Sequence, residues 1–484
     1  MGLSRVDAAA AADKAHAPTF WFRVGWQQST RFPAFDQYKI DGAIYNFRYT
    51  LHHKPPKCCA ATQSASKFVV TPKVFFASRG GSVAASVSKT QPYAGVHPLP
   101  RPQDHDVLIA GAGIVGASIA WHLAEAGLRV AVADATGPAA AASGASDGAV
   151  SVASKKPGVM ARLATGSLLY TRALAERGLL AAAYAARPSY VFGAGEAEMD
   201  AIAALIAKLA ALSGPVRVTA DGGAGLLAGA GPGVERLVAL EGEGHMPGHK
   251  AVRAYLAHPG ITALWPARLG AFEADDTGVT IDLGGRALRV GVLVAALGVS
   301  TAEIFPGLPV LPRAGQLIVT DAGPVGALPG SLTAAAYLLA KTEGPGSGTL
   351  PPVVIDPLST GQFLIGSSRE DHADPTRVDF ATIRRLLGRS TAAFPALAER
   401  RVIRAFAGIR AAVADGLPIV GPLPGNSRVI LATGFEGDGI CLSALIGREV
   451  AAMVRGASPA TDWAADLSAL APTRFGAIRK ERVA

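Results

Sequence analysis

The segment HDVLIAGAGIVGASIAWHLAEAGLRVAVAD, residues 105–134, constrains the fold more than any other part of the chain. The apolar run 107–110 is typical of a buried parallel strand, and it leads directly into a GxGxxG pattern. Apolar residues then recur with helical spacing, at Val115, Ile119 and Leu123. A second, largely apolar run, 128–133, follows Gly127. Together these features predict a strand–helix–strand unit.

Each glycine of the pattern has a physical role in a dinucleotide site. Gly111 permits a tight turn, Gly113 lets the backbone approach a pyrophosphate, and Gly116 allows close packing of the helix on the strand. The free N–H groups of the helix N-terminus, beginning at Ile114, favour phosphate binding. Asp134 at the end of the second strand is expected to accept hydrogen bonds from ribose hydroxyls and to disfavour a 2′-phosphate. The pattern does not separate FAD from NAD, and ligand-free packing of glycines remains an alternative.

Composition excludes several classes of protein. Half of the 484 residues are apolar and 17% are charged, so the chain can bury a core, and its length suggests about three domains. The three cysteines, Cys58, Cys59 and Cys441, have no metal-binding or disulfide-framework spacing, so we expect no metal site. The first hundred residues hold twelve Lys and Arg against four Asp and no Glu, and therefore carry most of the net charge of +9. The remainder is nearly neutral, and no nucleic-acid partner is expected.

Residues 1–104 form a basic, aromatic-rich N-terminal extension that we expect to be poorly ordered. An accessory extension, a mis-set start codon and an organelle leader remain alternatives. We find no signal-peptide or myristoylation pattern, and the uncharged stretch 107–122 is shorter than the roughly 18 apolar residues of a transmembrane helix. A cytoplasmic protein without a transmembrane segment is therefore expected.

Three later stretches resemble one family of flavoproteins. The segment AASGASDGAVS, residues 141–151, resembles the serine- and glycine-rich segment of the FAD-dependent oxidoreductases related to D-amino-acid oxidase, glycine oxidase and sarcosine oxidase. Residues 404–425 and 428–454 are similar to the closing signature of the same family. The resemblance implies non-covalently bound FAD, with Ser143 and Ser146 beside it. Covalent attachment through the lone cysteine of the last stretch is a weaker alternative.

The resemblance also implies the domain organisation. It predicts an α/β fold in which a Rossmann-like FAD-binding domain is interleaved with an α+β substrate-binding domain. The expected FAD-binding domain comprises residues 105–180, 243–312 and 405–470. The expected substrate-binding domain comprises residues 181–242 and 313–404, and residues 471–484 form a tail.

A glycine-rich loop near the C-terminus is expected to contact the flavin ring. Residues 429–432 resemble a buried strand, and an apolar helix face follows the loop. A helix N-terminus with free amides stabilises the negative charge of a reduced flavin. The expected cofactor contacts in this half of the chain are Gly298, Gly408, Gly437, Asp438, Gly439 and Ile440. For Asp438, capping of the helix is the alternative to a contact with the ring.

Arg410, in AGIRAA, is the principal candidate for substrate binding. In the family that this stretch resembles, the matching arginine pairs with the substrate carboxylate and orients the α-carbon hydrogen toward flavin N5. A structural salt bridge is the alternative. Tyr337 is a candidate to hydrogen bond the substrate, with a buried structural tyrosine as an equal alternative. The implied reaction is hydride transfer from the α-carbon of a small amino or imino acid.

The sequence departs from the family pattern in the same region. Ala411 replaces the usual proline, Phe435 replaces a common histidine, and Gly437 stands where glycine oxidase has a second arginine. Another resemblance is to the group of D-hydroxyproline dehydrogenase, opine oxidase and hydrogen cyanide synthase flavin subunits, and it implies electron-accepting partner subunits. The stretches that carry it are residues 242–256, 311–321, 334–344, 362–371 and 436–440. A catalytically silent FAD-binding subunit or scaffold and an NAD-dependent enzyme are the alternative functions.

Overall fold

The computed structural model describes residues 105–343, 352–458, 460 and 462–476, together with five short strands nearer the N-terminus. Those strands belong to a first compact unit, Met1–Pro92, and form two small antiparallel sheets. They are β1 (Ala10–Ala11), β2 (Thr19–Phe20), β3 (Asp36–Ile40), β4 (Ala43–Arg48) and β5 (Lys73–Val74). Most of the expected N-terminal extension lies outside the described residues. A second compact unit comprises Tyr93–Ala484.

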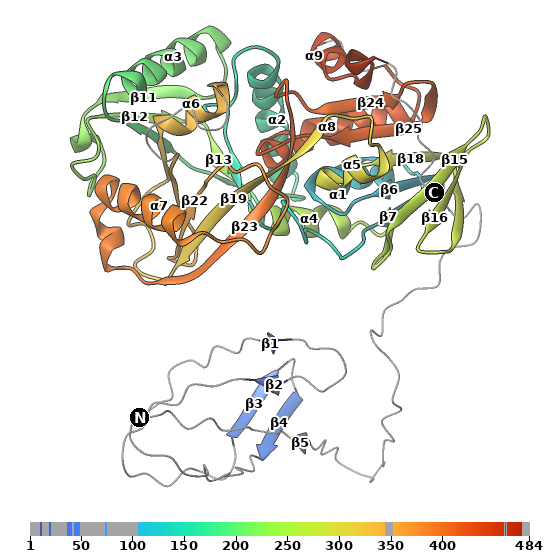
Figure 1. The fold of residues 1–484 in the computed structure, drawn as a ribbon, viewed down its shortest axis with the longest axis horizontal. Helices are drawn as coiled ribbons and strands as arrows, with labels where there is room; N and C mark the ends of the chain where they lie inside the picture. Colours follow the sequence, from blue (N-terminus) through green and yellow to red (C-terminus); the bar gives the residue numbers. More distant parts are fainter. Residues whose placement is uncertain are drawn as a thin grey trace. The chain divides into compact units, whose positions relative to one another are not determined.

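A six-stranded sheet in the second unit contains the predicted strand–helix–strand segment (Figure 1). Its order is β14-β7-β6-β18-β25-β24, and every neighbouring pair is parallel except β24 with β25. The strands are β6 (Val107–Ala110), β7 (Val130–Ala133), β14 (Ile261–Leu264), β18 (Val292–Ala295), β24 (Ile419–Leu423) and β25 (Asn426–Thr433). The carboxyl ends of the parallel strands therefore meet at one edge.

Both faces of this sheet are covered, which explains its nearly continuous apolar strands. Val107 and Ile109 belong to one buried cluster, whereas Leu108 and Ala110 belong to another. The first cluster includes helices α1 (Ile114–Glu125), α2 (Val159–Glu176), α4 (Gly248–Leu256) and α8 (Gly439–Val454). The second includes the antiparallel sheet of β15 (Leu269–Ala274), β16 (Val279–Leu283) and β17 (Ala287–Val290).

A second large sheet has the order β11-β12-β10-β20-β21-β22-β19-β23. Its strands are β10 (Ser189–Gly193), β11 (Arg217–Gly222), β12 (Arg236–Glu241), β19 (Val310–Thr320), β20 (Ser331–Ala334), β21 (Val354–Pro357), β22 (Phe363–Gly366) and β23 (Val402–Val413). Helices α3 (Glu196–Leu212), α6 (Ala335–Glu343) and α7 (Phe380–Ala393) pack with it. Smaller elements are β8 (Ala149–Val150), β9 (Ala185–Ala186), β13 (Gly244–His245), α5 (Thr301–Ile304) and α9 (Ala464–Ala469).

The long antiparallel pair β19 and β23 connects the two large sheets, because β23 is followed directly by β24 of the first sheet (Figure 1). The domain boundaries expected at residues 312 and 404 both fall inside this pair. The division into an FAD-binding and a substrate-binding domain therefore stays a proposal, in which the β19–β23 pair belongs to both domains.

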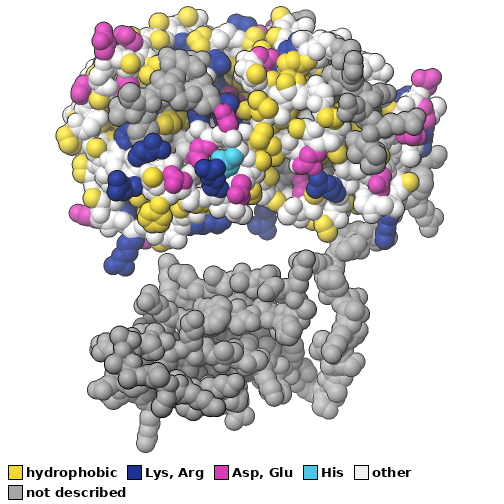
Figure 2. Space-filling model, viewed as in Figure 1, with side chains coloured by type: hydrophobic (Ala, Val, Ile, Leu, Met, Phe, Trp, Pro, Cys, Tyr) yellow, Lys and Arg dark blue, Asp and Glu magenta, His cyan; other side chains and the backbone are white. Residues whose placement is uncertain are grey.

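The surface of the described residues carries charges of both signs, interspersed over the face shown in Figure 2. Within the described ranges, no helix has the length and apolar character needed to cross a membrane.

Candidate active site

A cavity of about 310 Å³ opens at the carboxyl edge of the six-stranded sheet. The residues that follow four of its strands line the cavity: Gly111, Asp134, Ala296 and Gly434. β7 lies on one side of β6 and β18 on the other, so the loops after β6 and β18 diverge. Ligands of open parallel sheets bind at such a switch in strand order.

The glycine turn after β6 has the close contacts that its sequence predicts. Gly111 has a φ of +111°, and a Cβ atom there would lie 2.3 Å from the carbonyl oxygen of Ala296. A Cβ atom on Gly116 would lie 2.0 Å from the carbonyl oxygen of Gly111. Only glycine allows the turn and the close approach of α1 to the strand. Gly113 is the N-cap residue of α1 and lines the cavity.

Asp134 and Ser143 accept hydrogen bonds from backbone amides of the glycine turn and of the start of α1. The Asp134 carboxylate accepts hydrogen bonds from the backbone N–H groups of Ala112, Thr136 and Gly137, at 2.8 to 2.9 Å. A carboxylate has about four acceptor positions, so roughly one remains for a ligand hydroxyl. Ser143 Oγ accepts a hydrogen bond of 2.9 Å from the first helical N–H, that of Ile114. The Ser143 hydroxyl proton is left to donate toward the cavity.

Arg410 projects into the same cavity from β23. Its Nη2 donates to Ser367 Oγ at 2.6 Å, and its Nη1 lies 3.3 Å and 3.4 Å from the carbonyl oxygens of Ser368 and Ala314. Among the described residues, no carboxylate is within ion-pair distance of Arg410. The described residues therefore offer no partner for the structural salt bridge considered from the sequence, and no described carboxylate balances the guanidinium charge that faces the cavity.

An aromatic side chain and the glycine-rich loop after β25 also line the cavity. Tyr337 lines the cavity, is 9% exposed, and has no hydrogen-bond partner for its hydroxyl among the described residues. Glu436 has a φ of +46° and pairs with Arg369 at 2.5 Å and Arg313 at 3.4 Å. Phe435, which replaces a histidine of the family pattern, also lines the cavity. The expected proline position is filled by Ala411, whose carbonyl accepts from the Glu436 amide at 2.8 Å and anchors the loop.

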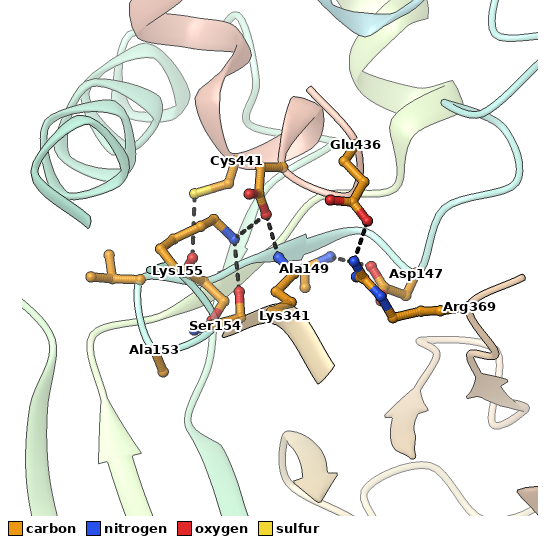
Figure 3. Close-up of polar contacts among 12 residues, drawn as sticks. Asp147, Ala149, Ala153, Ser154, Lys155, Lys341, Arg369, Glu436 and Cys441 are labelled. Carbon is orange, nitrogen blue, oxygen red and sulfur yellow. Dashed lines mark hydrogen bonds and ion pairs between the residues drawn. The ribbon is translucent and has the colours of Figure 1, made fainter. Parts of the chain in front are cut away.

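The capping role considered for Asp438 is wrong. Asp438 occupies the N-cap position of α8, but its side chain makes no capping hydrogen bond. Instead its Oδ1 accepts from Lys341 Nζ at 2.6 Å and Lys155 Nζ at 3.0 Å (Figure 3). The amides at the start of α8 are therefore not occupied by this carboxylate.

Cys441 is fully buried and lies outside the set of residues that line the cavity. Its Sγ donates to the carbonyl oxygen of Ser151 at 3.6 Å (Figure 3). Burial raises the pKa of the Cys441 thiol to about 11. This environment is typical of an inert packing residue rather than of a reactive thiolate.

The structure brings most of the expected site residues to one cavity. Those that line it are Gly111, Gly113, Ile114, Asp134, Ser143, Ser146, Gly298, Tyr337, Gly408, Arg410, Gly437, Gly439 and Ile440. Gly116 and Asp438 do not line it. Gly116 packs against the backbone of Gly111. Asp438 contacts Lys155 and Lys341 instead of the cavity.

Sequence reasoning missed Lys155, Lys341 and Ser367. A signal existed for each lysine. Lys155 is a charged residue that follows a run of small residues. Lys341 follows Tyr337 by four positions on α6, so Lys341 and Tyr337 lie on the same face of that helix. Ser367 had no local signal, since its contact with Arg410 depends on the pairing of β22 with β19 and of β19 with β23.

Comparisons with known proteins agree with this architecture. A family model described as DAO, FAD dependent oxidoreductase, matches residues 106–453. Glycine oxidase of Bacillus licheniformis is 25% identical over 413 residues, which cover 78% of this chain and 98% of that protein. Hydrogen cyanide synthase subunit HcnC of Pseudomonas protegens is 30% identical over 176 residues, covering 35% of this chain and 38% of that protein.

Solved structures show the same fold. Glycine oxidase from Geobacillus kaustophilus has a TM-score of 0.65 at 22% identity, covering 78% of this chain and 99% of its own. L-Proline dehydrogenase from P. horikoshii has a TM-score of 0.66 at 18% identity, covering 78% of this chain and all of its own. The expected α/β class with a Rossmann-like FAD-binding domain is thereby confirmed.

Proposed function

Because this chain belongs to the family of FAD-dependent oxidoreductases, we propose that it oxidises the bond between the α-carbon and the nitrogen of a small amino or imino acid. The single observation that carries the proposal is the cavity-facing guanidinium of Arg410, which lacks a carboxylate partner among the described residues. A planar guanidinium binds a carboxylate through two parallel hydrogen bonds.

The residues around the cavity fit FAD. Gly111 and Gly113 leave the backbone open beside the N-terminus of α1, which suits a pyrophosphate. The Ser143 hydroxyl and the remaining acceptor position of Asp134 suit a phosphate oxygen and a ribose hydroxyl. Gly437 and Gly439 free the amides at the start of α8 to approach the ring. The flavin supplies an acceptor for a hydride.

The protein contributes position and charge to the reaction. Arg410 holds the substrate carboxylate and thereby fixes the direction of the α-carbon hydrogen. When the amine is neutral, its lone pair forms the C=N bond as the hydride, with both electrons of the C–H bond, leaves. Water then hydrolyses a linear imine to an oxo acid and ammonia or an amine, whereas a cyclic imine remains as a pyrroline. The Tyr337 hydroxyl, which also lines the cavity, donates a hydrogen bond to the bound substrate.

The test is the visible flavin spectrum of the full-length FAD-loaded protein under anaerobic conditions. D-Proline, D-hydroxyproline, octopine, glycine and sarcosine are added separately, and bleaching near 450 nm reports reduction. Bleaching by one of them identifies the substrate class. A yellow protein that none of them bleaches contradicts the proposed substrate class and favours a silent FAD-binding subunit.

The same preparation distinguishes the electron acceptors. After bleaching, air, a soluble quinone analogue or an artificial one-electron acceptor is admitted, and the return of colour is timed. Rapid recovery in air supports an oxidase. Slow recovery in air with rapid recovery by an artificial acceptor supports electron transfer to a quinone or to a partner subunit.

A further inference from the structure

Two lysines from distant parts of the chain share one carboxylate beside the cavity (Figure 3). Lys341 belongs to α6, Lys155 follows β8, and both ammonium groups contact Asp438 Oδ1. The side chains of Lys155, Lys341 and Asp438 are 2%, 8% and 13% exposed. One carboxylate cannot neutralise two ammonium groups, so this lysine cluster has a net charge of +1.

The charges of Lys155 and Asp438 are stable near neutral pH. Burial by itself lowers the pKa of Lys155, but the adjacent Asp438 carboxylate outweighs burial and raises that pKa above its usual range. Burial likewise raises the pKa of Asp438, but the two lysines outweigh it and hold that pKa well below its usual range. Glu243 and Lys208 lie near the backbone of residues 153–155 and carry opposite charges. Their charges cancel, so the lysine cluster keeps its net charge of +1.

The lysine cluster lies directly behind the wall that the start of α8 presents to the cavity. Asp438 is the N-cap residue of α8, and its two sequence neighbours, Gly437 and Gly439, line the cavity. Lys341 Nζ lies 5.6 Å from the ring centroid of Tyr337, which lines the cavity as well. The partial positive charge of the helix N-terminus and the full charge of the cluster therefore act on the same wall.

We propose that Lys155, Asp438 and Lys341 act together as positioning residues that raise the reduction potential of the bound FAD. Two-electron reduction with uptake of one proton leaves one additional negative charge on the ring. A buried positive charge beside the ring stabilises that charge, because the protein interior and the bound cofactor exclude screening water. The proposal rests on the FAD dependence of the family and not on the identity of the substrate.

The experiment measures the reduction potential of the FAD-loaded full-length protein by equilibration with a reference dye. Lys341→Met removes one positive charge, and we expect the equilibrium constant for two-electron reduction to fall about ten-fold, or about 30 mV. Lys341→Arg keeps the charge and should restore the original potential. The matched control is Lys156→Met, because Lys156 is the sequence neighbour of Lys155 but makes no contact with Asp438 and points toward Gly416.

Asp438→Asn changes the charge of the cluster in the opposite direction to Lys341→Met, because it removes a negative charge. Because Asp438 also keeps Lys155 protonated, this variant is measured at a pH at which both lysines stay charged. Loss of the negative charge then leaves two positive charges, so the potential should rise while that of Lys341→Met falls. Shifts of the same sign in both variants, or a Lys341→Met shift no larger than that of Lys156→Met, would overturn the proposal. If Asp438→Asn does not fold, the comparison of Lys341→Met with Lys341→Arg still decides. Substrate bleaching is measured separately, so failure here leaves the proposed substrate class intact.

Discussion

Arg313 and Arg410 face each other across the β19–β23 ladder, yet only Arg313 has carboxylate partners among the described residues. Arg313 pairs with Asp371 at 3.1 Å and with Glu436 at 3.4 Å. Directly opposed residues of an antiparallel pair point to the same face of the sheet. Two positive charges therefore share one face of the sheet. Arg410 lines the cavity, and its charge is the one available to a ligand.

Replacement of Arg410 by leucine should impair the reaction with the amino acid that bleaches the flavin. Loss of a buried, bidentate charge pair costs about 3 kcal/mol or more, so kcat/KM should fall at least about 100-fold, with a higher KM and a lower kcat. Arg404→Leu on the exposed end of the same strand is the matched control. Steady-state kinetics check the prediction, and unchanged constants for Arg410→Leu would remove its proposed role.

Replacement of Ser143 by alanine should weaken FAD binding. The variant loses both the acceptor for the Ile114 amide and the hydroxyl donor to the cavity, which is worth about 1 kcal/mol, or about five-fold in Kd. Ser146→Ala is the comparison, because Ser146 lines the same cavity but its hydroxyl donates to the Ser143 carbonyl oxygen, whereas Ser143 Oγ accepts from the Ile114 amide. Titration of the apoprotein with FAD, followed by flavin fluorescence, gives both constants. An equal loss in Ser146→Ala would contradict a specific role for the Ser143 hydroxyl.

Gly111→Ala should destabilise the protein and abolish FAD binding. The added methyl group meets both an unfavourable φ of +111° and the Ala296 carbonyl oxygen at 2.3 Å. Gly127→Ala has a similar φ of +85° but no atom within 4 Å, so it isolates the cost of the backbone conformation, about 1 kcal/mol. Urea unfolding of both apoproteins provides the comparison. Equal losses of stability would show that the contact with Ala296 contributes nothing.

The flavin should be released in full when the protein is precipitated with acid. Cys441 is buried away from the cavity and its pKa is raised to about 11, so it offers neither access nor a thiolate for attachment. Cys441→Ala should accordingly retain the same amount of FAD. Absorbance of the supernatant and the pellet at 450 nm measures the distribution. Yellow colour that remains in the wild-type pellet but not in the variant pellet would identify a covalent link.

Stability should fall as the pH is lowered from about 6.5 to about 4, in part because of His122. Burial lowers the pKa of His122 to about 4, although a hydrogen bond with the Ser118 carbonyl opposes this effect. The unfolded chain therefore binds the proton first, and the folded state loses roughly 3 kcal/mol across this range. His122→Gln should flatten the dependence, whereas the exposed His249→Gln should not. The midpoint of urea unfolding, measured across this pH range, checks the prediction. If the midpoints of wild type and His122→Gln change with pH in parallel, His122 is not the cause of the loss of stability.

The local segments of the nucleotide site follow closely from the sequence. The expected strands at 107–110 and 429–432 are present as β6 and within β25, and the apolar spacing after Gly113 matches α1. These features depend on residues that are near neighbours along the chain, where periodicity and glycine conformation are decisive. The segment 289–297 is an exception: its composition is typical of a single strand, but Gly291 separates β17 from β18, and the two strands belong to different sheets.

The strand–helix–strand unit, the family and the glycines around the cavity follow from the order of the amino acids. The packing of the folded chain is needed to show that Asp438 binds Lys155 and Lys341, and that Arg410 contacts Ser367 and no carboxylate among the described residues. Local patterns fix which residues form an element, because backbone preferences act over a few residues. The partners of a buried charge come from elements far apart in the chain, and the packing of those elements, driven by burial of apolar surface, selects them.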